Sequence, residues 1–395
     1  MKNIKIVIGS MYGDEGKGFT VDYLCSNLKN KGSGLAVRHN STAQAGHTVE
    51  RNGIRHVFKT FGAGMLQNHI YTLLASTFVV EPIHLIIEAE KLAEIFKVDV
   101  SDMLNLLYID LDCKVILPWD RMLNEKIERE RQLTSVNHGS CGYGLFESII
   151  RGQEYRHFTI EDLYQSYLQG ELLTLLREIQ HNHYYTSKLD NVYGEELIQN
   201  FKMDLEKIFD SCNIVNEANI MNKFNNLVFE GAQGLMLDWD RNEFMPHLTA
   251  SKTNSENVEM LLNKINGEKD IEIIYVTRTY HTRHGKGYMQ HEVSCAKDLG
   301  FDLFDETNQP NEFQETLRYG YFDLKNFSNN VTMDYNRFAE SYPETKLGIM
   351  MTHSKLTDGS VLFPNEKIPM LKFKELLKFK VDNFYVGDLD RVVKI

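Results

Sequence analysis

Cysteine is scarce in this 395-residue sequence, and none of its five cysteines forms a CxxC pair. Disulfide scaffolds and zinc ribbons need closely spaced cysteines, so the sequence argues against both and favours a reducing, cytoplasmic location. A strand-like apolar run begins at residue 4, so no signal peptide is expected. The longest apolar run, 77–87, is interrupted by Glu81 and Pro82 and is too short to span a bilayer, so no membrane partner is expected.

Positive charge is also sparse, because no lysine- or arginine-rich run is present and the formal net charge is −12. A nucleic-acid partner is therefore not expected, although an acidic protein can still carry a local basic pocket. The seven prolines do not cluster and no low-complexity linker is present. The length and the 42% hydrophobic content are enough for one large domain or two smaller ones.

Short apolar runs typical of strands alternate with helical patterns. The strand-like runs are 4–8, 34–38, 57–58, 70–74, 227–229 and 271–276, and the helical patterns include 82–96 and 256–265. This alternation predicts an α/β fold with a large, mostly parallel central sheet flanked by helices. The segment of about 155–225 is polar and helical in period, which predicts a helical subdomain within a single domain, 1–395. A separate small helical domain is the alternative.

Glycine-punctuated motifs border several of these elements: AQAGHT at 43–48, HGSCGYG at 138–144, FEGAQG at 229–234 and TRHGKG at 282–287. In a parallel sheet, loops of this kind gather at the carboxyl edge, where ligands bind. The sequence therefore predicts a ligand site at that edge.

The loop GSMYGDEGKGF, 9–19, joins a strand to a helix and is typical of an anion site. It is not a P-loop, because residue 11 is not glycine and Gly18 lacks the hydroxyl of GxxxxGK[ST]. Lys17 can contact a phosphate, but Asp14 and Glu15 would repel one unless a cation such as magnesium intervenes. One carboxylate could instead act as a general base. The alternative is a surface turn whose acids merely begin a helix.

Other polar residues offer similar pairs of interpretations. His47 is a candidate proton donor or phosphate-polarising group, or a buried, hydrogen-bonded histidine. Gln233 could contact a base edge or a small anion, or only brace its loop. Arg318 could bind a carboxylate or pack by its stem. The densest positive cluster, a candidate anion site or a solvated face, comprises Arg278, His281, Arg283, His284 and Lys286.

Four motifs, in order, resemble the adenylosuccinate synthetase family. GSMYGDEGKGFTVDYL is similar to GxQWGDEGKGKxVDxL, and AVRHNSTAQAGHTV to VVRxxGGxNAGHT. FEGAQGLMLDWD with MPHLTASKTNS is similar to EGAQGxxLDxDxGxxPxVTSSNT, and YVTRTYHTRHGKG to xxKAYxTRVGxGPFPTE. The resemblance covers nearly the whole chain and is thin at about 155–225 and after 360. It implies the family's α/β fold, which is related to P-loop NTPases.

The resemblance also implies a reaction, in which L-aspartate is joined to the 6-oxo carbon of a purine nucleoside monophosphate. A nucleoside triphosphate and Mg2+ drive it. By resemblance, Asp14 removes the purine N1 proton and His47 helps to transfer the γ-phosphoryl group to O6. The aspartate amine then displaces the 6-phosphoryl group. Lys17 and Gln233 complete the implied catalytic set, which agrees with phosphoryl transfer by positioning and charge neutralisation.

The implied metal ligands are the Asp14 carboxylate and the Gly46 carbonyl. Gln233, Thr249 and Ser140 match the nucleoside monophosphate site, and Arg151 lies about where the family uses an arginine of the partner subunit, which implies a homodimer. The full set of implied nucleotide contacts is Gly13, Glu15, Gly16, Gly18, Ser140, Arg151, Thr249, Arg283, Arg318 and Lys355.

Two departures bear on the substrates. Lys355 in MTHSKLTDG stands at the aspartate of the guanine-reading TKLD motif, and an ammonium cannot accept from guanine, which favours an adenine nucleotide donor. The TTGRRRR loop is replaced by PNEFQETLRYGYFD, which leaves only Arg318 and suits a 2′-deoxy substrate.

These departures, with RHVFKTFGAGML and NHGSCGYG, resemble the branch of phage 2-aminoadenylosuccinate synthases, which use dGMP, aspartate and ATP or dATP. A phage-encoded enzyme would act in the host cytoplasm. Asp14 argues for IMP instead, because that branch often has a smaller residue there. A non-catalytic nucleotide-binding regulator is a further alternative, suggested by the diverged ending YVGDLDRVVKI. An unrelated P-loop ATPase is disfavoured by the missing GK[ST].

Overall fold

The computed structural model describes residues 1–28, 32–67, 69–133, 142–191, 194–301, 317–388 and 391–395. Its centre is a ten-stranded sheet in the order β19-β18-β15-β11-β1-β10-β2-β5-β7-β9. Every neighbouring pair is parallel except β18 and β19. The predicted fold class, a large and mostly parallel sheet flanked by helices, is confirmed.

The strands of this sheet are β1 (Lys2–Gly9), β2 (Gly34–Arg38), β5 (Ile70–Leu74), β7 (Leu107–Asp110), β9 (Asn213–Val215), β10 (Asn226–Gly234), β11 (Lys269–Arg278), β15 (Lys346–Thr352), β18 (Asn383–Asp388) and β19 (Arg391–Lys394). Smaller sheets pair β3 (His47–Arg51) with β4 (Ile54–Phe58), β6 (Val79–Val80) with β8 (Lys114–Val115), and β16 (Ser360–Leu362) with β17 (Lys367–Pro369). A three-stranded sheet joins β12 (His281–Arg283), β14 (Arg318–Gly320) and β13 (Glu292–Val293).

The helices are α1 (Lys17–Ser26), α2 (Pro82–Phe96), α3 (Val100–Leu104), α4 (Pro118–Leu133), α5 (Leu145–Glu154), α6 (Ile160–Leu168), α7 (Leu172–Gln180), α8 (His183–Thr186), α9 (Glu195–Ser211), α10 (Glu217–Lys223), α11 (Glu256–Leu262), α12 (Leu324–Ser341) and α13 (Met370–Leu376). Short 3-10 turns are η2 (Leu235–Leu237), η3 (Asn242–Phe244), η4 (Ala296–Leu299) and η5 (Ser354–Thr357). No helix in the described part of the chain is long and apolar enough to cross a membrane.

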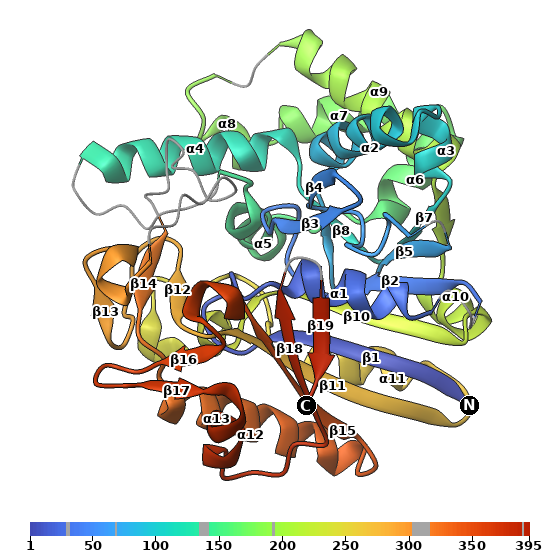
Figure 1. Ribbon diagram of the computed structural model, residues 1–395. Coiled ribbons are helices and arrows are strands. Elements are labelled where there is room, and N and C mark those ends of the chain that lie inside the picture. Colours follow the sequence, from blue (N-terminus) through green and yellow to red (C-terminus); the bar gives the residue numbers. More distant parts are fainter. Residues whose placement is uncertain (29–31, 68, 134–141, 192–193, 302–316, 389–390) are drawn as a thin grey trace.

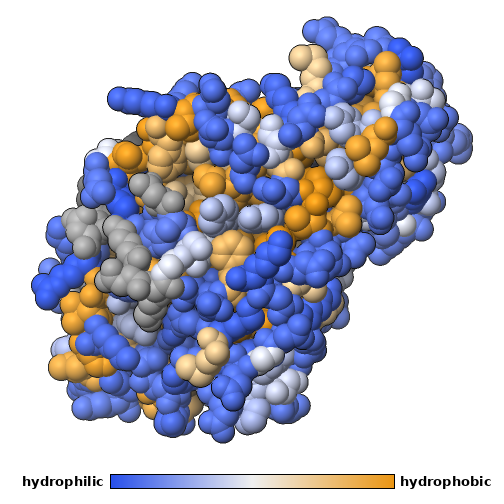
Figure 2. All heavy atoms as spheres, turned by 90° about the vertical axis from the view of Figure 1, so that its right-hand side faces the viewer, coloured by the Kyte–Doolittle hydropathy of each residue, from blue (hydrophilic) through white to orange (hydrophobic). Residues whose placement is uncertain are grey.

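Both faces of the sheet are buried, as the apolar strand runs require. Along β1, Ile4, Ile6 and Ile8 pack with α11, α12 and α13, whereas Val7 packs on the opposite face with α1 and α2. Figure 1 shows α12 and α13 below the sheet and α2 to α9 gathered above it. On the face drawn in Figure 2 the surface is mostly hydrophilic, and hydrophobic side chains collect toward its centre.

Local sequence patterns predicted some element bounds correctly and others only in part. Helix α2 begins and ends where the pattern predicts, because Pro82 occupies its first turn and the Glu81 side chain accepts from the His84 amide. The strand expected at 57–58 is longer, since β4 pairs with β3 in a separate hairpin outside the main sheet. Helices α6, α7 and α9 share a hydrophobic core with α2.

Candidate active site

A cavity of about 460 Å³ opens beside the carboxyl ends of β1 and β10. This volume is within the range of small-molecule sites. Loops that follow β1, β2, β10 and β12 contribute to its wall, so the expected gathering of the glycine-punctuated motifs takes place. Ten of the residues selected from the sequence line it: Gly13, Asp14, Lys17, Gly46, His47, Gln233, Thr249, Arg283, His284 and Lys286.

Asp14 presents a free carboxylate to this cavity. Among the described residues no hydrogen bond or ion pair holds its side chain, while the Arg278 guanidinium donates to its main-chain carbonyl. Burial raises the pKa of the Asp14 carboxyl, and the positive charges of Arg278, His284 and Lys17 oppose that rise. A carboxylate with a raised pKa on a cavity wall is suited to accept a proton from a ligand.

Glu15 has a different role from its neighbour. Its buried carboxylate accepts the amides of Met11 at 3.0 Å and Gly13 at 2.9 Å and pairs with Lys17 at 3.0 Å. Lys17 also donates to the Gly13 carbonyl. In this structure the Glu15 carboxylate has internal partners, because a buried carboxylate needs donors and this loop supplies them, and its nucleotide contact stays a prediction. The Gly13 amide is engaged by Glu15 and not directed at a phosphate.

Gly16 and Gly18 shape the start of α1. Gly16 has φ +92 at the helix N-cap, where a Cβ would lie 3.1 Å from a Thr352 methyl carbon. A Cβ at residue 18 would lie 2.8 Å from the His47 Cβ and 2.9 Å from its carbonyl carbon. The hydroxyl residue of a P-loop is absent here because His47 packs directly on α1. These two glycines therefore have packing roles, and their expected nucleotide contacts stay predictions.

Replacing Gly18 by alanine is expected to reduce the free energy of unfolding by about 2 kcal/mol, since an overpacked core must shift to accept the methyl group. The displaced His47 should also lower kcat. Urea unfolding and a turnover assay measure both effects. Gly194→Ala is the matched control, because its Cβ meets nothing within 4 Å and its φ of −70 suits alanine. Equal stability of the two variants would contradict the packing role.

His47 is oriented by a buried carboxylate that the sequence analysis did not select. Its Nδ1 contacts Glu230 Oε1, and its buried Nε2 has no hydrogen-bond partner among the described residues. His47 as a residue lines the cavity. Burial lowers the pKa of His47, while Glu230 raises it, and the net direction is down. The lowered pKa favours the neutral imidazole, and its Nε2 is left without a hydrogen-bond partner among the described residues.

Glu230 is fully buried at the end of β10. Arg38 lies 3.7 Å from one carboxylate oxygen, and the Ala63 amide donates to the other at 2.9 Å. Burial alone would raise the pKa of Glu230, but Arg38 and the contact with His47 outweigh it and lower the pKa. The glutamate in EGAQG was the available signal for this residue.

Gln233 adopts a backbone conformation that is rare for residues with a side chain, with φ +63. Its Oε1 lies over Gly13, 3.2 Å from where a Cβ would be. Asn40 holds this turn, because its side chain donates to the Ala232 and Lys252 carbonyls at 3.0 and 2.9 Å and accepts the Ala232 amide at 2.7 Å. Such local strain is concentrated at functional sites.

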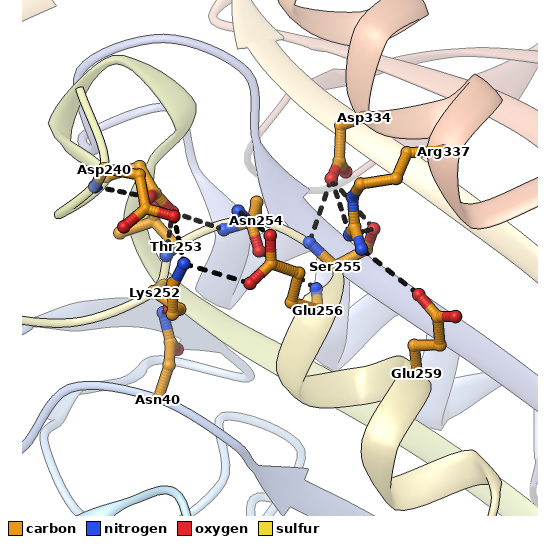
Figure 3. Close-up of polar contacts among 11 residues, drawn as sticks. Asn40, Asp240, Lys252, Thr253, Asn254, Ser255, Glu256, Glu259, Asp334 and Arg337 are labelled. Atoms are coloured by element: carbon orange, nitrogen blue, oxygen red, sulfur yellow. Dashed lines mark hydrogen bonds and ion pairs between the residues drawn. The ribbon is translucent and has the colours of Figure 1, made fainter.

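Thr249 also lines the cavity, and its hydroxyl accepts a hydrogen bond from the Gln44 amide at 3.1 Å. Gln44 is a residue that the sequence analysis did not select. The chain after Thr249 is fastened to α12, as Figure 3 shows. Asp334 accepts the Ser255 amide at 3.0 Å and its hydroxyl at 2.8 Å, and Arg337 joins Asp334 to Glu259. This network fixes the segment that positions Thr249.

Arg283 and Arg318 brace the loop between β12 and β13. Arg283 is buried and donates to the carbonyls of Lys286, Tyr288 and His247 at 2.7–3.1 Å. Arg318 donates to the Gly285 and Gly287 carbonyls at 2.9 Å and pairs with Glu292. These guanidinium donors serve the protein in this structure, and the expected nucleotide contacts stay predictions. Arg283 still borders the cavity through its side chain.

Three further residues from the expected nucleotide set lie elsewhere. Arg151 is buried and donates to Asp120 at 3.0 Å within its own chain, and its contact with a partner subunit stays a prediction. The Lys355 side chain is exposed, and its amide donates to Asp388, which also accepts the Ser354 hydroxyl at 2.6 Å. Ser140 is outside the described residues.

Asp388 lies beside the segment that is similar to the guanine-reading motif. The segment similar to TKLD does have a carboxylate beside it, supplied by β18 and not by the motif. Its partner Ser354 begins the turn η5, whose last residue, Thr357, is buried and bonds to Thr279 at 3.1 Å. This carboxylate already accepts the Ser354 hydroxyl and the Lys355 amide, so the adenine nucleotide donor stays a prediction.

No group of three or more His, Cys, Asp or Glu side chains suited to hold a metal occurs among the described residues. The two expected Mg2+ ligands nevertheless fit this ion, since the free Asp14 carboxylate and Gly46 line the same cavity. Mg2+ prefers oxygen donors and commonly takes one or two from a protein, with substrate phosphates and water completing the shell.

Comparison with known proteins decides the family. The adenylosuccinate synthetase family model matches residues 6–339. The chain belongs to the adenylosuccinate synthetase family. Its relatives include the adenylosuccinate synthetases of Blochmanniella pennsylvanica, 28% identical over 80% of this chain and 71% of that protein, and of Hydrogenobaculum sp., 27% identical over 81% and 73%.

Two solved structures show the same fold. The fully ligated adenylosuccinate synthetase of Plasmodium falciparum superposes with a TM-score of 0.69 at 19% identity, covering 90% of this chain and 77% of that one. The succinoaminodeoxyadenylate synthetase of cyanophage S-2L, bound to dGMP and to dATP as energy donor, superposes with a TM-score of 0.62 at 16% identity, covering 100% and 95%.

As a member of the adenylosuccinate synthetase family, the protein is a nucleotide-binding C–N ligase of purine biosynthesis. The family acts on a purine nucleotide, aspartate and a nucleoside triphosphate, and it is generally Mg2+-dependent.

Proposed function

We propose that the enzyme condenses L-aspartate with dGMP, driven by ATP or dATP, to give 2-amino-2′-deoxy-N6-succinyladenylate. The observation that carries the ligase chemistry is that Asp14, His47 and Gln233 line the same cavity. The Asp14 carboxylate is free, and His47 Nε2 has no hydrogen-bond partner among the described residues. Support for dGMP comes from the loss of the TTGRRRR loop and from the fold shared with a synthetase solved with dGMP and dATP.

In the first half-reaction Asp14 takes the purine N1 proton, and O6 attacks the γ-phosphorus of the donor. The bond from that phosphorus to its bridging oxygen breaks, which leaves a 6-phosphoryl nucleotide and a nucleoside diphosphate. His47 and Lys17 line the cavity in which negative charge is transferred, and the Gln233 amide can contact O6. For Lys17 to contact a phosphate, its ammonium must exchange part of its bonding to Glu15 and the Gly13 carbonyl. Asp14 and the Gly46 carbonyl would hold Mg2+, which would neutralise phosphate charge.

In the second half-reaction the aspartate amine attacks C6 and inorganic phosphate leaves with the C6–O bond. The amine nitrogen loses its proton as the N6-succinyl product forms. Gln233 and Thr249, fixed through Asn40 and the Asp334 network, would hold the nucleotide while the two steps proceed.

IMP is the second candidate substrate, and two observations favour it. Asp14 is present where the phage branch often carries a smaller residue, and the sequence relatives are named adenylosuccinate synthetases. The homodimer stays a prediction drawn from the resemblance, since Arg151 pairs within its own chain.

The substrate assay is expected to yield the succinylated product from dGMP, Mg2+, L-aspartate and ATP or dATP, with kcat/KM for dGMP exceeding that for IMP. Mass spectrometry identifies the product and phosphate release gives the rate. GTP in place of ATP tests the donor, and a reaction without aspartate is the control. Product from IMP alone would replace dGMP by IMP. A nucleotide-dependent melting shift without any product would favour a binding regulator.

A further inference from the structure

Two sequence stretches that the proposed reaction leaves without a role meet on the cavity wall. RHVFKTFGAGML, 55–66, supplies Lys59, and NHGSCGYG, 137–144, supplies Tyr143. Both residues line the same cavity as Asp14. The Lys59 ammonium donates to the Tyr143 hydroxyl oxygen and lies 4.9 Å from the centroid of its ring. This contact is only partly buried, so a ligand in the cavity can reach it.

Lys59 is held in place both through its main chain and through its partner. It directly follows the β4 residue that pairs with His47 of β3. Its amide donates to the buried Glu88 of α2 at 2.9 Å. The Tyr143 ring packs on His84, also of α2, with the ring centroids 4.6 Å apart. A cation that is fixed in this way loses little side-chain freedom when it binds a ligand.

The charge of Lys59 has no carboxylate partner among the described residues. Two other cations of the cavity wall do have one, because Lys17 pairs with Glu15 at 3.0 Å and Arg131 pairs with Glu128 at 2.6 Å. An ammonium has three N–H donors and no acceptor, so its bond to Lys59's phenol partner uses the oxygen and leaves the phenol O–H free to donate. The pair therefore offers one positive charge and several donors to an anion.

We propose that Lys59 and Tyr143 form an anion subsite that binds a phosphate group of a nucleotide substrate. The inference deepens the proposed function and rests on it for the nucleotides that enter this cavity. The remaining ammonium N–H groups and the phenol O–H donate to the phosphate oxygens, and the phosphate supplies the counter-charge of Lys59. The phosphate belongs either to the nucleoside monophosphate or to the triphosphate donor, and the test separates these two sources.

The test is the dissociation constant of each nucleotide, measured by calorimetry for the wild type and for Lys59→Met. The nucleotides are dGMP, IMP and ATP with Mg2+, and the matching nucleosides serve as ligands without phosphate. The Kd of the two monophosphates, or that of ATP, is expected to rise about 10- to 100-fold, the loss of one hydrogen bond to a charged group. The Kd of the nucleosides should not change. Lys91→Met, at an exposed lysine of α2, is the matched control.

Further variants separate charge from packing. Tyr143→Phe keeps the ring beside the ammonium and removes the hydroxyl, so it should raise the same Kd by less, roughly 2- to 10-fold. Lys59→Arg keeps the positive charge and should retain most of the affinity. Melting temperatures verify that each variant folds. If Lys59→Met does not fold, Lys59→Gln takes its place, because it removes the charge and keeps a polar group for Tyr143.

Two results would overturn the subsite. One is an unchanged Kd for dGMP, IMP and ATP in the folded charge-removing variant. The other is an equal rise for a nucleotide and its nucleoside, because the contact would then not involve phosphate. The measurement needs no turnover, so it can fail independently of the proposed function. Product from IMP alone would replace dGMP as the substrate, and the IMP and ATP measurements would still decide the role of Lys59.

Discussion

Asp14→Asn is expected to lower kcat about 1,000-fold, the middle of the range for loss of a general base. The amide cannot take the purine N1 proton, so O6 does not become nucleophilic. The fold should be unaffected, because no described residue bonds to the Asp14 carboxylate and asparagine has the same shape. ATP binding should persist, since Lys17 and its loop remain.

Three measurements check this expectation: phosphate release with the preferred monophosphate, the melting temperature, and ATP affinity by calorimetry. Asp112→Asn is the matched control, because it makes the same change on an exposed turn after β7. Near-normal kcat in Asp14→Asn would remove the base assignment. A fall in melting temperature well beyond that of the control would instead give Asp14 a structural role.

Glu230→Ala is expected to lower the free energy of unfolding by about 3–5 kcal/mol, because it leaves a buried charge without its partner. Arg38 is fully buried. Its Nη1 donates to the Phe61 carbonyl at 3.3 Å and also lies near the Glu230 carboxylate, which is its counter-charge. The same change leaves the Ala63 amide and the His47 Nδ1 without the carboxylate that they contact. Urea unfolding measures the loss.

The matched control is Glu50→Ala, which removes an exposed ion pair with Arg55 and should cost about 0–1 kcal/mol. Glu230→Gln separates charge from shape, because it keeps the side-chain volume. It should lower kcat through a misoriented His47 while folding better than Glu230→Ala. Equal stability of Glu230→Ala and Glu50→Ala would show that Arg38 finds another partner, and it would contradict the buried network.

Much of the fold followed from local pattern. The alternation of apolar runs and helical periods specified parallel strands buried on both faces, and parallel strands bring their following loops to one edge. One cavity is therefore lined by Asp14, Lys17, Gly46, His47 and Gln233. Hairpin β3–β4 was missed as a separate unit because an apolar pair of residues does not reveal which strand it joins.

The roles of the charged residues were less predictable. The sequence predicts nucleotide contacts for Glu15, Arg151, Arg283 and Arg318, and in this structure each of them also satisfies groups of the protein. A charged side chain next to glycines has the same pattern in either case. What decides between them is whether backbone carbonyls, amides or a counter-charge lie within reach, and only the folded chain shows that.

The sequence by itself determined the family, the sheet and the edge at which chemistry takes place, because period and motif are properties of neighbouring residues. The tertiary structure decided how that site is held. Glu230 orients His47 from 183 residues away, and Arg278 holds the Asp14 carbonyl across 264 residues. Such pairs depend on how distant strands pack, and desolvation then makes each buried charge require its partner.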